Sequence, residues 1–270
     1  MSTLTEVIAG DGLIVVPGAH DALAAKLFQQ AGFSAVYMSG NGLSASLLAV
    51  PDIGLLTMTE MVARGRAFAA AVHIPVIADA DTGYGGPHHV ARTVREYEAV
   101  GVAAIHLEDQ VFPKRCGAAD GVELISACDH AAKIRAATQA RSGTEFLIIG
   151  RTDARLVAGF PEALHRAQRY VDAGADLILV EMLQTPEEIE NLVSAIEVPV
   201  MFNAVAGKTP DLTPGQYAEL GVKLLVYPLA SILMYAQTMQ DFAHYLAAGK
   251  APQKFRPQAL SLAQYTQILN

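Results

Sequence analysis

Residues 75–86 read PVIADADTGYGG, and after a spacer with helical character residues 103–117 read AAIHLEDQVFPKRCG. Each stretch is a short apolar run that ends in acidic residues, which is typical of a buried strand leaving the core. Asp79 and Asp81 are two residues apart, so on an extended chain their carboxylates face the same side. The second run ends in Glu108 and Asp109. Hard oxygen ligands at the ends of neighbouring strands suit Mg²⁺ or Mn²⁺.

The same alternation of apolar runs and amphipathic segments continues along the whole chain and indicates a parallel α/β fold. Eight strand–helix pairs without a break favour a closed (β/α)8 TIM barrel over an open doubly wound sheet. No glycine fingerprint for a dinucleotide follows the first strand. We expect that first strand at Leu13–Val16, stopped by Pro17 and Gly18. The stretch from Gly40 to Leu56 is expected to be a loop, long enough to be functional.

Composition limits the class of protein. The 270 residues are 52% hydrophobic, which fits one barrel domain spanning 1–270 with a C-terminal helical tail. A net charge of −8 argues against nucleic acid as a partner. The apolar run 224–236 contains Pro228 and is too short for a membrane span, and residues 1–10 lack signal-peptide character. Two cysteines form no disulfide scaffold, which favours the cytoplasm, and Cys128 is expected to be an inert core residue.

Polar residues stand at the end of nearly every expected strand. In a TIM barrel the active site is built at the C-terminal ends of the strands. A purely structural polar plug would be unusual at so many strands, because buried polar groups are costly without partners. The candidates in chain order are Tyr37, Ser39, Gly40, Asp79, Asp81, His106, Glu108, Arg151, Asp153, Glu181 and Asn203.

Three motifs, ADADTGYGG (78–86), HLEDQVFPKRCG (106–117) and GRTDA (150–154), together resemble the isocitrate lyase/phosphoenolpyruvate mutase superfamily. The segment KRCG (114–117) is similar to the lyase branch, which includes methylisocitrate lyase. The resemblance covers nearly the whole chain. It implies an (α/β)8 barrel, a Mg²⁺ ion and chemistry next to a 2-oxo or 2-hydroxy carboxylate. It also implies a homotetramer in which the last long helix swaps between subunits.

The resemblance also implies roles for individual residues. Cleavage beside a carboxylate leaves a carbanion, which a metal-bound carboxylate or oxo group can stabilise. Cys116 is expected to protonate it, with Lys114 and Arg115 lowering the pKa of the thiol. Tyr37 matches the position that takes the proton of the 2-hydroxyl. Asp79 is expected to bind the metal directly, and Asp81 and Glu108 through waters. The expected substrate-binding residues are Ser39, Gly40, Asn41, Asp52, His106, Gly117, Arg151, Glu181 and Asn203.

The expected function is Mg²⁺-dependent cleavage of a small 2-hydroxy di- or tricarboxylate, of the 2-alkylmalate or methylisocitrate type. Oxaloacetate hydrolysis or decarboxylation is the alternative within the superfamily. A Schiff-base aldolase would need a lysine inside the barrel, and no expected strand end provides one. A barrel that binds an organic acid without catalysis is the alternative from another class.

Three positions depart from the tricarboxylate lyases that the chain resembles. Those enzymes continue the cysteine motif with a histidine and then a lysine, where this chain has Ala118 and Val122. Methylisocitrate lyases also carry an arginine just after the last strand, at a position that corresponds to Leu233. A buried carboxylate without a cationic partner costs several kcal/mol. We therefore expect a smaller acid, such as dimethylmalate or oxaloacetate, to be preferred.

Overall fold

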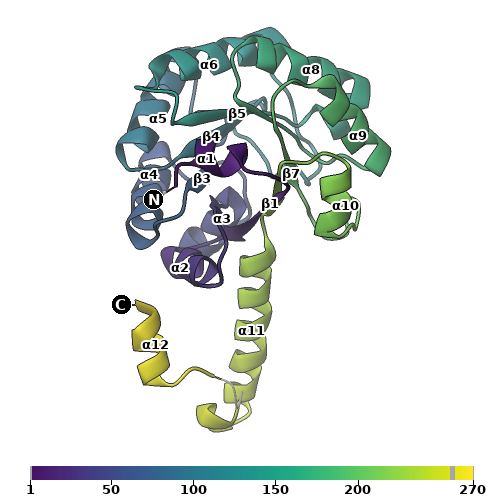
Figure 1. Ribbon diagram of the computed structural model, residues 1–270. Coiled ribbons are helices and arrows are strands. Elements are labelled where there is room, and N and C mark those ends of the chain that lie inside the picture. The colour runs from purple at the N-terminus through teal and green to yellow at the C-terminus, as the bar shows by residue number, and fades with distance from the viewer. Residues whose placement is uncertain (1, 256–258, 270) are drawn as a thin grey trace.

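Eight parallel strands close into a barrel in the order β1-β2-β3-β4-β5-β6-β7-β8, which confirms the predicted fold (Figure 1). The computed structural model describes residues 2–255 and 259–269. The strands are β1 Ile14–Ala19, β2 Val36–Met38, β3 Val76–Asp79, β4 Ala104–Glu108, β5 Leu147–Thr152, β6 Leu177–Val180, β7 Val200–Asn203 and β8 Leu224–Tyr227.

Helices surround the barrel, and most begin with a side-chain cap. Thr57, for example, accepts a hydrogen bond from the Glu60 amide, and the Glu60 carboxylate accepts one from the Thr57 amide. The helices are α1 Leu4–Ala9, α2 Ala22–Gln30, α3 Gly40–Leu48, α4 Met58–Ala71, α5 Pro87–Ala99, α6 Ala127–Ala140, α7 Ala154–Ala158, α8 Phe160–Asp172, α9 Pro186–Ala195, α10 Pro214–Glu219, α11 Ala230–Ala247 and α12 Leu262–Leu269, with a 3-10 turn at Pro252–Lys254.

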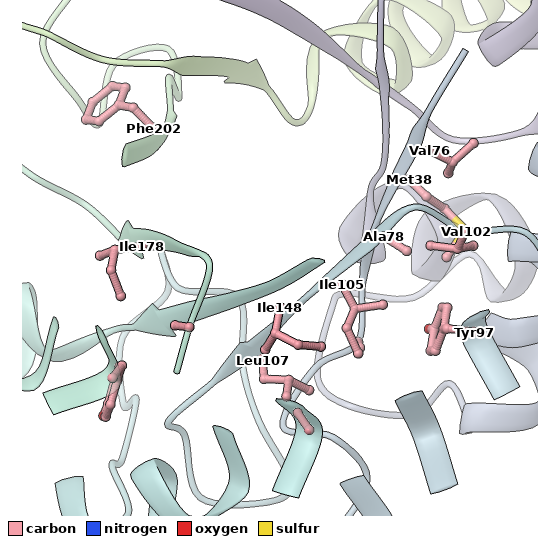
Figure 2. Close-up of a cluster of buried hydrophobic side chains, with 14 of the residues drawn as sticks. Met38, Val76, Ala78, Tyr97, Val102, Ile105, Leu107, Ile148, Ile178 and Phe202 are labelled. Carbon is pink, nitrogen blue, oxygen red and sulfur yellow. The ribbon is translucent and has the colours of Figure 1, made fainter. Parts of the chain in front are cut away.

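Alternation along each strand divides the side chains between two environments. In β4 the odd positions face the helices: Ile105 and Leu107 lie in the outer core with Ile148 and Tyr97 (Figure 2). The even position Ala104 lies in the smaller inner cluster that fills the barrel, together with residues such as Ile77 and Ile149. Continuing the same alternation turns the later even positions of β4 inward, at the C-terminal end of the barrel.

The structure corrects several expectations from the sequence. Strand β1 does not stop at Val16, because Pro17 keeps its register with Tyr227 of β8 and Gly18 pairs with Tyr37 of β2. The expected 40–56 loop is shortened by α3, which Ser39 caps. Helices α1 and α7 are additional elements. Leu4 of α1 belongs to the inner cluster.

Cys128 is exposed on α6, so its assignment to the core is wrong. A single polar or small residue on an amphipathic helix does not reveal which face it occupies, which explains the error.

The C-terminal region projects from the barrel. Helix α11 extends away from the strands and α12 runs back beside α2 (Figure 1). Lys26 and Gln30 of α2 donate hydrogen bonds to the carbonyls of Leu269 and Ile268. None of the helices formed by residues 2–255 and 259–269 has the length and hydropathy needed to span a bilayer.

Candidate active site

The polar residues predicted at the strand ends meet in one site. Strand register places Asp79 beside His106 and Glu108 beside Arg151. A cavity of about 40 Å³ lies at this end of the barrel. Its lining includes Tyr37, Ser39, Asn41, Asp52, Asp79, Cys116, Gly117, Arg151, Glu181 and Asn203.

Asp79, His106 and Tyr37 form a buried hydrogen-bonded group. The Tyr37 hydroxyl lies 2.8 Å from Nε2 of His106 and 3.4 Å from Oδ2 of Asp79. Burial lowers the pKa of His106 to about 4, so the imidazole is neutral near pH 7. Burial raises the pKa of Tyr37 well above its usual value, and Asp79 adds to this effect. Although burial opposes it, the surrounding His106, Lys114 and Arg151 hold the pKa of Asp79 below its usual range.

Glu108 is fully buried, and neither of its carboxylate oxygens has a hydrogen-bond partner. One of them lies 3.2 Å from Nη1 of Arg151. Burial raises the pKa of Glu108 well above its usual value, against the opposing charges of Arg151 and Lys114. A buried carboxylate that lacks donors is a position where a cation would be stabilised.

Lys114 lies inside the barrel mouth and links two acids. Its Nζ is 2.7 Å from Oδ1 of Asp52 and 2.7 Å from Oδ1 of Asp81. Burial alone would lower the pKa of Lys114, but the carboxylates led by Asp81 raise it well above its usual value. The sequence did not reveal this buried lysine, because Lys114 belongs to a loop. A lysine held as an ammonium ion is a poor nucleophile, which argues against the Schiff-base aldolase.

Arg151 is the second cation of the site. It makes a bidentate pair with Asp153, with Nη2 at 2.8 Å from Oδ1 and Nε at 3.1 Å from Oδ2. Asn203 donates to Oε2 of Glu181 at 2.9 Å, while Oδ1 of Asn203 has no partner. Asp153, which the sequence placed only among the strand-end candidates, thus anchors the arginine. The Arg-x-Asp spacing at the end of β5 is the sequence signal from which this role of Asp153 could be predicted.

Helix α3 points its N-terminus toward the site. Ser39 is the N-cap, and its hydroxyl oxygen accepts a hydrogen bond from the Gly42 amide. A Cβ at Gly40 would lie 2.5 Å from Oδ2 of Asp79, so only glycine permits this approach. The free amides of a first helical turn favour an anionic group. The backbone at Ser39, Gly40 and Asn41 therefore suits a substrate carboxylate.

The loop that carries Cys116 closes over the cavity. The Cys116 amide donates to the carbonyl of Asp52 at 3.0 Å, and a Cβ at Gly117 would collide with Asp153, Arg151 and Glu181. Burial raises the pKa of the Cys116 thiol above its usual value. The expectation that Lys114 and Arg115 lower this pKa is therefore wrong, because Lys114 turns toward its acids and Arg115 is exposed.

The site holds more buried acidic side chains than basic ones. Six buried carboxylates stand against two buried cations, Lys114 and Arg151; the acids are Asp52, Asp79, Asp81, Glu108, Asp153 and Glu181. Among residues 2–255 and 259–269, six buried side-chain polar atoms lack a hydrogen-bond partner. Four of them are here, on His106, Glu108 and Asn203. Such a combination calls for a cationic or polar ligand.

A divalent cation fits these residues. Asp79, His106 and Glu108 each offer one ligand atom, and these atoms lie within 4.8 Å of one another. Asp81 is not in this group, and one of its oxygens pairs with Lys114. Asp109, the neighbour of Glu108, faces outward and pairs with Arg166 at 3.0 Å.

The fold and the site define an enzyme-type barrel with an acidic, metal-compatible centre. A family model described as phosphoenolpyruvate phosphomutase matches residues 4–247. The chain belongs to this family, within the phosphoenolpyruvate mutase/isocitrate lyase superfamily. Members of the superfamily are typically dependent on a divalent metal.

Several relatives are named as lyases. The chain is 47% identical to the 2,3-dimethylmalate lyase of Eubacterium barkeri, over 88% of this chain and 83% of the relative. It is 44% identical to a 2-methylisocitrate lyase of Aeropyrum pernix, over 84% of this chain and 73% of the relative.

Solved structures of related enzymes have a similar fold. An oxaloacetate acetylhydrolase bound to 3,3-difluorooxalacetate has a TM-score of 0.94 and 31% identity, covering 99% of this chain and 92% of the other. A 2,3-dimethylmalate lyase has a TM-score of 0.93 and 33% identity, covering 98% of this chain and 89% of the other.

Proposed function

We propose that this protein is a lyase that cleaves the C2–C3 bond of a 2-hydroxy dicarboxylate, giving a 2-oxo acid and a second carboxylate. The observation that carries the proposal is the buried Glu108, which lacks hydrogen-bond partners beside Asp79 and His106 in an acid-rich site. Similarity to lyases over most of the chain supports it.

Mg²⁺ is the proposed metal, with Mn²⁺ as a substitute. Carboxylate oxygens and waters are the ligands Mg²⁺ prefers, so Asp79 would bind it directly and Asp81 and Glu108 through waters. A phosphonopyruvate hydrolase, 36% identical, has a solved structure that is named as a complex with oxalate and Mg²⁺. When bound, the cation supplies stabilisation for negative charge on the substrate oxygens.

The protein's own residues hold the substrate and move the protons. The α3 N-terminus at Ser39–Asn41 and the remaining N–H groups of Arg151 bind one carboxylate. Glu181, Asn203, Asp52 and Gly117 contact the rest of the substrate. Tyr37 accepts the proton of the 2-hydroxyl and can pass its own proton to neutral His106, 2.8 Å away.

Bond cleavage then follows. C2 becomes the carbonyl carbon, and the electron pair of the C2–C3 bond moves to C3. Cys116 donates a proton to C3. The raised pKa of its thiol keeps Cys116 protonated at neutral pH, which is the form a donor requires. Lys114 holds Asp52 and Asp81 in place rather than activating the thiol.

A small dicarboxylate is the proposed substrate. Ala118 lines the active-site cavity, and Val122 and Leu233 line neighbouring pockets, so none offers a cation to a further carboxylate. Arg155 is engaged by Glu188, with Nη2 at 2.7 Å from Oε1. A 2-alkylmalate such as 2,3-dimethylmalate is therefore favoured over isocitrate or methylisocitrate.

A substrate screen tests this proposal. We would compare kcat/KM for 2,3-dimethylmalate, methylisocitrate, isocitrate and oxaloacetate at saturating Mg²⁺, with and without EDTA. The expected result is release of pyruvate from dimethylmalate that EDTA abolishes. A wide preference for a tricarboxylate would contradict the charge argument and assign the missing contact to Lys208. Binding of all acids without turnover would identify an organic-acid-binding barrel.

Oxaloacetate hydrolysis is a second candidate, because an oxaloacetate acetylhydrolase superposes with a TM-score of 0.94. Release of acetate and oxalate from oxaloacetate in the same screen would favour it. Pyruvate and CO₂ would instead identify a decarboxylase.

We propose that the protein assembles as a homotetramer in which α11 is exchanged between subunits. We also propose that it is located in the cytoplasm. Met234 is 68% exposed on α11, and Met239 and Tyr265 on the two C-terminal helices are exposed as well. Apolar surface of this kind marks an interface. Light scattering should give four times the chain mass of 28.6 kDa, and a stable monomer would contradict the assembly.

A further inference from the structure

A second pocket adjoins the active-site cavity and has no role in the reaction proposed above. Its volume is about 370 Å³, and its lining comes from the chain after β7, helix α10 and the first turns of α11. Ala118, Val205 and Leu229 line both this pocket and the active-site cavity. The two spaces are therefore neighbours across these three residues. We refer to the second space as the side pocket.

The walls of the side pocket are largely apolar. Leu212, Tyr217, Tyr227 and Leu233 contribute to them. Lys208 and Asp211 are the charged residues of the lining; both are exposed, and their charges are opposite. A carboxylate placed in the pocket would lose water without gaining a buried cation, whereas an alkyl chain would gain free energy from leaving water.

We propose that the side pocket binds an aliphatic substituent of several carbons on C3 of the substrate. The inference rests on the lyase function proposed above and names its substrate class: malates alkylated at C3 with a chain longer than methyl. The position follows from the proton donor. C3 is the atom that Cys116 protonates, and Ala118, two residues further along the same loop, lies on the shared wall. The proposal therefore places a chain on C3 beside Ala118, on the side where the two spaces adjoin.

A chain-length series tests the inference on the unmodified protein. We would measure kcat/KM for 2-methylmalates that carry methyl, ethyl, butyl or hexyl at C3, all with Mg²⁺. Each methylene that leaves water is expected to raise kcat/KM about fourfold, until the pocket is filled. Cleavage of dimethylmalate with no gain for the butyl compound would overturn the inference and leave the lyase function intact. No cleavage of any malate would overturn the lyase function itself.

A pair of variants checks the location. Leu233 is 59% exposed and lines the side pocket but not the active-site cavity. Leu233→Asp should lower the butyl-to-methyl ratio of kcat/KM at least fivefold while leaving dimethylmalate turnover unchanged, and Leu233→Met should keep the ratio. An unchanged ratio in Leu233→Asp would overturn the placement. If that variant does not fold, inhibition of the wild-type enzyme by propionate, pentanoate and hexanoate replaces it, and must strengthen with chain length.

Discussion

Replacing Lys114 by methionine should destabilise the protein strongly. The ammonium group is buried and lies 2.7 Å from each of Asp52 and Asp81. Methionine fills similar space but leaves both carboxylates without their shared partner. Removing one member of a buried ion pair typically costs about 3–5 kcal/mol, because the remaining charge is uncompensated.

That cost converts into a measurable fall in Tm. Unfolding entropy is about 2.1 cal/mol/K per residue, so a chain of 270 residues has an entropy of about 0.6 kcal/mol/K. The predicted decrease in Tm for Lys114→Met is therefore about 5–9 °C. Differential scanning calorimetry at pH 7.5 in EDTA measures it without a contribution from bound metal.

Two further variants separate the lost ion pair from other effects. Lys254→Met removes an exposed lysine and should change stability by no more than about 0.5 kcal/mol. Asp81→Asn in the Lys114→Met background should recover part of the loss, because it removes one unpaired charge. A Tm for Lys114→Met within 2 °C of wild type, or no recovery in the double variant, would refute the reasoning.

Three other predictions concern the chemistry of the site. Cys116→Ala should lower lyase turnover about 10²- to 10⁴-fold and leave the affinity for pyruvate, measured by calorimetry, unchanged. Cys128→Ala is the control and should have near-normal turnover. Near-normal turnover in Cys116→Ala as well would mean that another group donates the proton. Glu108→Gln should weaken Mg²⁺ binding by calorimetry at least tenfold, whereas the exposed Glu190→Gln should not; equal affinities would remove Glu108 from the metal site. Burial raises the pKa of Cys116, so iodoacetamide should alkylate it more slowly than the exposed Cys128 at pH 8, and the rate for Cys116 should still increase above pH 9. Peptide mass spectrometry measures both rates. Fast reaction of Cys116 at pH 7 would contradict the prediction, because it would show a thiolate.

The sequence allowed the barrel and the location of the site to be predicted. The alternation along a strand has a period of two, so the sequence could place His106 and Glu108 on one face of β4. The structure then sets Asp79 of β3 beside His106. The eight repeats then put that face at the mouth of a barrel. These features are local in sequence, which is why they could be predicted.

The partners of the charged residues could not be predicted. Lys114 reaches Asp52, which is 62 positions away in the sequence, and no local pattern specifies this pairing. The same limitation explains the wrong expectation for the Cys116 thiol, because Lys114 is near in sequence but directs its charge toward Asp52 and Asp81. Helix α3 was missed for another reason: GNGLSASLL contains two glycines, which disfavour a helix, but Ser39 caps it and its position beside Asp79 requires the glycine at residue 40.

The fate of the C2–C3 bond tests the central claim most directly. The protein, with Mg²⁺, would be incubated with 2,3-dimethylmalate in D₂O, and both products would be identified by mass spectrometry and NMR. We predict pyruvate without deuterium from the enzyme and propionate with a single deuterium at C2, the former C3 of the substrate. Both should be absent in EDTA, and Cys116→Ala should form them about 10²- to 10⁴-fold more slowly. Release of CO₂, absence of a 2-oxo acid, or turnover that persists in EDTA would contradict the assignment as a metal-dependent carbon–carbon lyase.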